Sequence, residues 1–167
     1  DLDLAFNMED QVLPLGLSSL WAGAGAKYSW HGVCACATKV SGFASRPHEI
    51  YWYKGLDDQR ILMKWYSLTI TEPTLWHNNK NLGGYAEARD PLKALNLSKE
   101  LMNNPKYPYL ISGAFGKGWD DLLTTTSEFL EVARKNSNSE YQVIVSNEID
   151  FFQDFEKEYG AVLPSET

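Results

Sequence analysis

The chain has 167 residues, a formal net charge of −7 and a pI near 4.9. This length buries roughly two-thirds of the unfolded surface around one core, so we expect a single domain. The acidic balance and the absence of a basic stripe exclude nucleic acid as a partner. The uncharged stretch 11–26 is interrupted by Pro14 and Gly16 and has no basic region before it. The sequence therefore predicts no membrane span and no signal peptide, and it assigns no localisation.

The first part of the chain predicts a helix, a strand and a hairpin. Residues 13–24 carry apolar side chains at helical spacing, and Gly25 can end this helix. Residues 27–30 form a short predicted strand, and the Gly-, Ala-, Ser- and Pro-rich stretch after it predicts a loop. Two aromatic and β-branched runs, residues 49–54 and 60–68, then predict a β-hairpin.

The remaining chain alternates helices and strands. We predict helices over residues 91–102, 120–135 and 147–159, and short buried strands over residues 109–112 and 141–145. Strands that alternate with helices are typical of parallel sheets with right-handed crossovers. The predicted fold class is therefore α/β, with parallel strands alternating with helices and one hairpin.

In such folds ligands collect beyond the carboxyl ends of the parallel strands. This rule selects the loop after Trp30, the loop after Ser112 and the turn at residues 146–148. The loop after Ser112 contains Trp119, which offers a stacking face, and Asp120, at the start of a predicted helix. Asp120 either caps that helix, or Asp120 or Trp119 contacts a ligand.

Other candidate residues have two interpretations each. Glu9 and Asp10 are capping acids of the first helix or catalytic carboxylates. Glu87 and Arg89, in a glycine-containing loop, form a solvated ion pair or part of a substrate site.

A metal site near His31 lacks the expected ligand pattern. Cys34 and Cys36 follow His31 closely, but zinc sites use four ligands at characteristic spacings, and His48 and His77 show no partner pattern. Two cysteines one residue apart also bridge poorly, so we expect reduced, partly buried thiols. The metal ligands stay unassigned.

Several segments in order resemble a known family. The runs are LPLGLSSLWAGAGAKYSW, RPHEIYWYKGLDDQRILMKWYSL, GAFGKGWDDLLTTTSEFLE and EIDFFQDFEKEYGAVLP. They are similar to the middle portion of the catalytic domain of alpha-mannosidase-like glycoside hydrolases, family 38, in a divergent bacterial branch. Residues 50–62 resemble the aromatic F-W-W-E-G-x-D-G-S-R-V-L hairpin of that family.

The resemblance implies a fold that is part of a seven-stranded β/α barrel. It implies hydrolysis of an alpha-mannosidic bond with retained configuration, by two carboxylates roughly 5 Å apart. It also implies a zinc ion, held in the family by His and Asp ligands, that orients the substrate. The resemblance suggests catalytic candidates Asp10, Glu9 and Asp120, and a mannoside site lined by Trp30, His31, Trp119, Glu87 and Arg89.

The early His-x-Asp metal motif of the family and its Asp-x-Phe-Gly nucleophile segment are absent from this sequence. Residue 1 is Asp rather than Met. We therefore expect residues 1–167 to be a single α/β domain or a fragment of a larger glycosidase catalytic domain. The fragment would be inactive alone, and the rest of the parent chain would be its partner. Two alternatives stay open, a carbohydrate-binding module without turnover and a structural α/β module.

Overall fold

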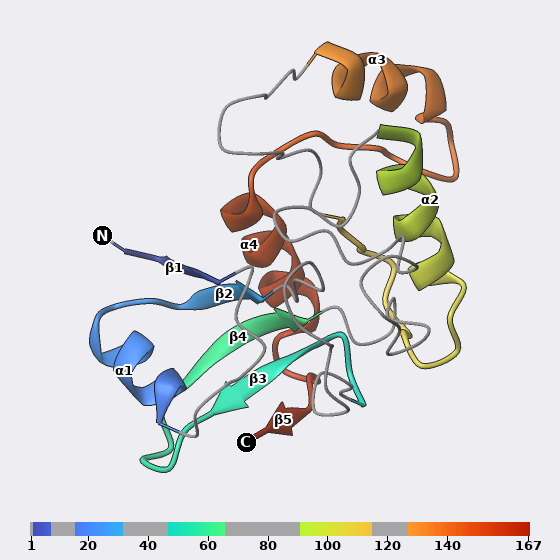
Figure 1. The fold of residues 1–167 in the computed structure, drawn as a ribbon. Coiled ribbons are helices and arrows are strands. Elements are labelled where there is room, and N and C mark those ends of the chain that lie inside the picture. The colour runs from blue at the N-terminus through green and yellow to red at the C-terminus, as the bar shows by residue number, and fades with distance from the viewer. Residues whose placement is uncertain (1, 8–15, 32–46, 66–90, 115–126) are drawn as a thin grey trace, which may run out of the picture.

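The computed structural model describes residues 2–7, 16–31, 47–65, 91–114 and 127–167. Within these residues the chain has a mixed α/β fold with a five-stranded sheet and four helices (Figure 1). In chain order the elements are β1 (Leu4–Asn7), α1 (Leu17–Gly23), β2 (Tyr28–His31), β3 (Ile50–Lys54), β4 (Arg60–Trp65), α2 (Pro91–Met102), α3 (Ser127–Asn136), α4 (Glu148–Tyr159) and β5 (Ser165–Glu166). The predicted α/β class is confirmed for these residues.

The sheet is open and mostly parallel, with the strand order β1-β2-β4-β3-β5. β1, β2 and β4 run in the same direction, whereas β3 is antiparallel to β4 and parallel to β5. The last residues of the three codirectional strands, Asn7, His31 and Trp65, lie in one register row. The carboxyl ends of β1, β2 and β4 therefore meet at the same end of the sheet.

α4 packs its apolar stripe onto the sheet. Phe152 and Phe155 are fully buried, and the Phe152 ring stacks on Tyr28 of β2 at 5.2 Å with an interplanar angle of 1°. Ile149 and Tyr159 pack against the same core cluster. Asn147 caps the helix, since its side chain accepts a hydrogen bond from the backbone N–H of Asp150. The helix predicted over residues 147–159 is confirmed.

The predicted hairpin is also confirmed, as β3 and β4 with a turn closed by a 2.8 Å hydrogen bond from Gly55 N to the Gln59 carbonyl. Asp58 in this turn has a φ of 63°, the left-handed conformation that aspartate tolerates in turns.

α2 spans the predicted residues 91–102. α3 matches the second half of the predicted helix 120–135, whose first half lies outside the described residues.

The strand predicted at residues 109–112 is wrong. This segment has no strand pairing and leaves Leu110 87% exposed. The segment is held by side chains of α4 instead. The Tyr109 ring packs on Phe155 and Tyr159, and Leu110 N donates a hydrogen bond to the Tyr159 hydroxyl at 3.1 Å. Contacts with helix α4 therefore hold this segment, which is not paired with a strand.

The buried strand predicted at residues 141–145 is wrong as well. Ile144 is 63% exposed, and the segment has no strand assignment. The chain turns back after α3, where Asn138 N donates to the Tyr141 carbonyl and Val143 N donates to the Ser137 hydroxyl. These local hydrogen bonds satisfy backbone groups that a sheet would have paired.

Two strands, β1 and β5, were not predicted, because each is short and depends on a distant partner. The first helix is α1, which begins at Leu17 after the N-cap Gly16. Gly25 after it has a φ of 96°, as a helix-ending glycine does. Among the described residues, no helix is long and apolar enough to cross a membrane.

Candidate functional site

A groove with a volume of about 1070 Å³ lies between α4 and the neighbouring helices α2 and α3. Its lining joins Trp30 on β2, the segment 110–114 and the segment 140–148. The turn 146–148 and the start of the loop after Ser112, Gly113 and Ala114, line the groove. The rest of that loop and the loop after His31 lie outside the described residues. The volume is at the upper end of the range for ligand pockets.

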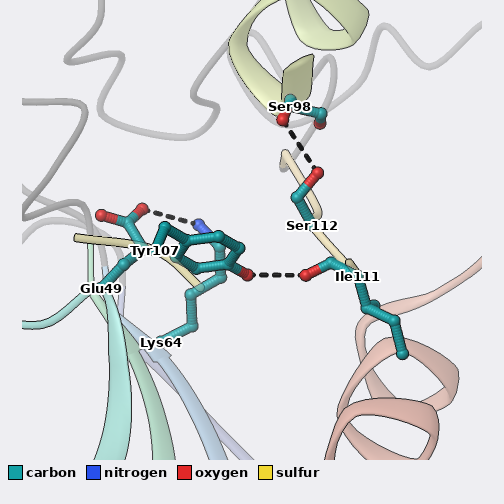
Figure 2. A network of polar contacts seen from close by, with 6 residues as sticks. All are labelled: Glu49, Lys64, Ser98, Tyr107, Ile111 and Ser112. Atoms are coloured by element: carbon teal, nitrogen blue, oxygen red, sulfur yellow. Dashed lines mark hydrogen bonds and ion pairs between the residues drawn. The ribbon is translucent and has the colours of Figure 1, made fainter. Parts of the chain in front are cut away.

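The segment 110–114 is fixed to both sides of the groove. The Ser112 hydroxyl donates to the Ser98 carbonyl of α2 at 2.9 Å, and the Tyr107 hydroxyl donates to the Ile111 carbonyl at 2.7 Å (Figure 2). A Cβ on Gly113 would lie 2.9 Å from the Phe151 ring of α4, so only glycine lets this backbone approach the helix so closely. One wall of the groove is therefore held in place by a helix, a buried tyrosine and a glycine contact.

Trp30 is 3% exposed and packs between the groove and the interior. Its ring lies 5.2 Å from Phe151 and 5.9 Å from Phe152 of α4. The Lys64 ammonium of β4 lies 4.5 Å from the centroid of the same ring, in cation–π geometry. Trp30 therefore supports the groove from below and presents little of its own surface to it.

Lys64 and Glu49 form a buried ion pair close to Trp30. The Lys64 Nζ lies 3.2 Å from Glu49 Oε1, and the two side chains are 1% and 0% exposed (Figure 2). Burying a charge costs several kcal/mol unless a partner compensates it. The pair keeps two opposite charges in the interior in a neutral arrangement, with Lys64 next to Trp30.

The solvent side of the groove carries a ring and carboxylates. Tyr141 is 38% exposed, and the Lys99 ammonium lies 5.5 Å from the centroid of its ring. Asp150, Asp154 and Glu158 of α4 also line the groove. Because they are four residues apart on one helix, these three side chains share one face. The groove therefore combines an aromatic surface with hydrogen-bond acceptors.

The turn before α4 is held by its own side chains. The Ser146 hydroxyl donates a short hydrogen bond to Asp150 Oδ2, and Asn147 Nδ2 donates to the same oxygen at 3.1 Å. The Asn147 Oδ1 accepts from Asp150 N at 3.0 Å. Asp150 is thereby oriented at the mouth of the groove, at the start of the helix.

Trp30 and His31, both predicted to line the substrate site, are consecutive on β2 and project from opposite faces of the sheet. His31 is 0% exposed and stacks on Trp65 at 4.0 Å with an interplanar angle of 9°. It is absent from the groove lining, whereas Trp30 is part of it. The structure thus brings only one of these two residues to the groove.

Six predicted site residues lie outside the described residues, namely Glu9, Asp10, Glu87, Arg89, Trp119 and Asp120. The same holds for Cys34, Cys36 and His77. His48 is described, and its Nδ1 lies 2.6 Å from Glu166 Oε1 of β5. Within the described ranges, no three His, Cys, Asp or Glu side chains gather in a metal-binding group. The described residues thus do not by themselves form the zinc site that the resemblance implies.

Sequence reasoning missed several groove residues. Tyr141 was assigned to a buried strand, and Phe151, Asp150, Asp154 and Glu158 were treated only as parts of a helix. The spacing of the three acids, four residues apart, was the available signal, because it predicts one charged helix face. The apolar stripe of α4 packs on the sheet, so this acidic face points away from it.

Comparison with known proteins gives no relative: no family model, no curated protein and no solved structure matches the chain.

Proposed function

We propose that the chain is a glycoside hydrolase-like α/β domain that binds a mannoside in the groove between α4 and the helices α2 and α3. The observation that carries this proposal is the convergence of Trp30 and the segments 110–114 and 140–148 on one groove. The proposal combines this geometry with the resemblance to alpha-mannosidase-like glycoside hydrolases. We further propose that the sheet forms part of a seven-stranded barrel in a longer parent chain.

The chemistry of the groove suits a sugar. Sugars present C–H faces that pack on aromatic rings and hydroxyl groups that form hydrogen bonds. Tyr141 supplies an accessible ring, and Asp150 and Asp154 supply acceptors on the facing helix. The rigid wall around Ser112 and Gly113 keeps the groove open before a ligand arrives.

For catalysis the proposal keeps the carboxylates suggested by the resemblance. Asp10, Glu9 and Asp120 are the candidates for the nucleophile and the acid/base of a retaining mechanism. Glu9 and Asp10 follow Asn7, the last residue of β1, by two and three positions. Zinc belongs to the family, and no step of this proposal passes through it.

A second candidate is a carbohydrate-binding module without turnover. It is favoured by one observation: the groove lining combines the exposed Tyr141 ring with carboxylates, and a ring and hydrogen-bond acceptors are sufficient to bind a sugar without hydrolysing it.

Titration of the chain with methyl α-mannoside and α-mannobiose in a calorimeter tests the proposal. We expect binding, and a loss of about tenfold in affinity for Tyr141→Ala, because an aromatic stacking contact contributes up to about 1.5 kcal/mol. Leu20→Ala is the control, since Leu20 is 71% exposed and lies on α1 away from the groove. No binding, or an equal loss in both variants, would overturn the proposal.

Release of 4-nitrophenol from 4-nitrophenyl α-mannoside separates the two candidates. Turnover by the parent chain would establish the hydrolase, because a binding module releases no chromophore. We expect binding without turnover from residues 1–167 alone, and turnover once the proposed parent chain supplies its remaining barrel strands.

A further inference from the structure

On the basis of the proposed saccharide function, we propose that the groove prefers a saccharide with a free ammonium group over its neutral and anionic counterparts. The first observation is the charge of the lining. Five carboxylates line the groove, those of Glu140, Glu148, Asp150, Asp154 and Glu158.

Few positive charges compensate these carboxylates. Two lysines, Lys99 and Lys157, line the groove with them. The ion pairs found within the described residues involve none of the five acids. The groove therefore has a negative potential that attracts cations and repels anions.

The second observation concerns α4. Asp150, Asp154 and Glu158 are spaced at four-residue intervals, so neighbouring members of this row lie about 5–6 Å apart at their Cβ atoms. Like charges at this spacing destabilise a helix. A bound ammonium group would offset this repulsion. Its N–H groups would donate charge-assisted hydrogen bonds to the carboxylates.

The third observation is that the Tyr141 ring in the groove lining already lies close to a cation. The Lys99 ammonium lies 5.5 Å from the centroid of the Tyr141 ring. An ammonium group is attracted to the face of a tyrosine ring, and an exposed ring offers this attraction to a ligand as well. Tyr141 is 38% exposed, so the ring retains surface for a ligand. The groove lining thus contains both elements that recognise an ammonium group, an aromatic ring and carboxylates.

The test uses ligands that share the mannose ring and differ in charge. We would titrate the chain with methyl 2-amino-2-deoxy-α-mannoside, its N-acetyl derivative, methyl α-mannoside and a mannuronate oligomer, at an ionic strength of about 20 mM. We expect the amino sugar to bind about tenfold more tightly than its N-acetyl derivative, and the mannuronate more weakly than methyl α-mannoside. Salt at about 0.5 M should remove most of the preference, because it screens exposed charges.

Charge-neutral variants locate the preference. The double variant Asp154→Asn with Glu158→Gln should reduce severalfold the ratio of the affinity for the amino sugar to the affinity for its N-acetyl derivative. Glu131→Gln is the matched control, because Glu131 is an exposed acid of α3 that does not line the groove. Circular dichroism checks that the variants retain their helices.

Equal affinity for the amino sugar and its N-acetyl derivative would overturn the inference while the proposed mannoside function stands. A preference that the Asp154 and Glu158 substitutions leave unchanged would also overturn it, since the groove would not be its source. If no ligand of the series binds, both the proposed function and this inference are wrong.

Discussion

Replacing Lys64 by Met should destabilise the protein strongly. Lys64 and Glu49 are paired at 3.2 Å with side chains only 1% and 0% exposed. The single substitution Lys64→Met leaves the Glu49 carboxylate buried without this partner. Breaking a buried ion pair in this way costs about 3–5 kcal/mol of the free energy of unfolding. For a domain with a total of about 5–15 kcal/mol, this is a large fraction.

Replacing both charges should cost far less. In the double variant Lys64→Met with Glu49→Leu, neither charge of this pair is left in the interior, and apolar side chains take their place. Such replacements are often neutral or stabilising by about 1–4 kcal/mol. The methionine thioether also keeps a favourable contact with the Trp30 ring in place of the ammonium group.

Urea unfolding followed by tryptophan fluorescence measures these differences. The control is Lys54→Met, which removes an ion pair with Asp58 whose side chains are 41% and 83% exposed, and should cost less than about 1 kcal/mol. The reasoning is refuted if Lys64→Met costs no more than the control. It is also refuted if the double variant loses as much stability as the two single variants combined.

Two further predictions concern α4. Tyr28→Phe removes the 2.7 Å hydrogen bond to Glu156 and keeps the ring, so it should cost about 1 kcal/mol in urea unfolding. Burial and the hydrogen bond to Glu156 raise the pKa of Tyr28. As the pH rises, the unfolded chain therefore loses the Tyr28 proton before the folded chain does, and the free energy of unfolding falls above about pH 10. A fall just as steep in Tyr28→Phe would contradict this. Gly113→Ala places a Cβ 2.9 Å from the Phe151 ring and should cost about 1–3 kcal/mol. Its near-ultraviolet circular dichroism should change, and an unchanged spectrum would exclude the contact.

The parts of the fold that were predicted correctly are those specified by local chemistry. The hairpin β3–β4 follows from two β-prone runs around a turn, and α4 from a capping asparagine and an apolar stripe. Pro91 at the first position of α2 fixes the start of that helix in the same way. In each case the signal lies within about a dozen residues.

The parts that were predicted wrongly depend on distant neighbours. Residues 109–112 and 141–145 have strand-like composition, but a strand also needs a partner with free hydrogen-bonding groups. Around these segments the aromatic face of α4 and the Ser137 and Asn138 side chains provide other contacts. The sequence indicates the apolar character of a segment and leaves its partner undetermined.

The candidate groove was predicted in part. The rule that ligands bind beyond strand ends selected the neighbourhoods of Ser112 and the turn 146–148, which the structure brings together even though the preceding segments are not strands. The separation of Trp30 from His31 follows from the alternation of side chains along β2. The acids of α4 line the groove because α2 and α3 lie on its other side, and this arrangement of helices could not be predicted from the sequence.

The placement of the first and last strands has a consequence for the order of assembly. β1 and β5 are the outer strands of the sheet, and β5 pairs Ser165 with Trp52, far away in the chain, whereas β3 and β4 are neighbours in sequence. Closing a long loop costs more conformational entropy than closing a hairpin. We expect the sheet to grow outward from its hairpin, with the carboxyl-terminal strand joining last and exchanging its amide hydrogens first.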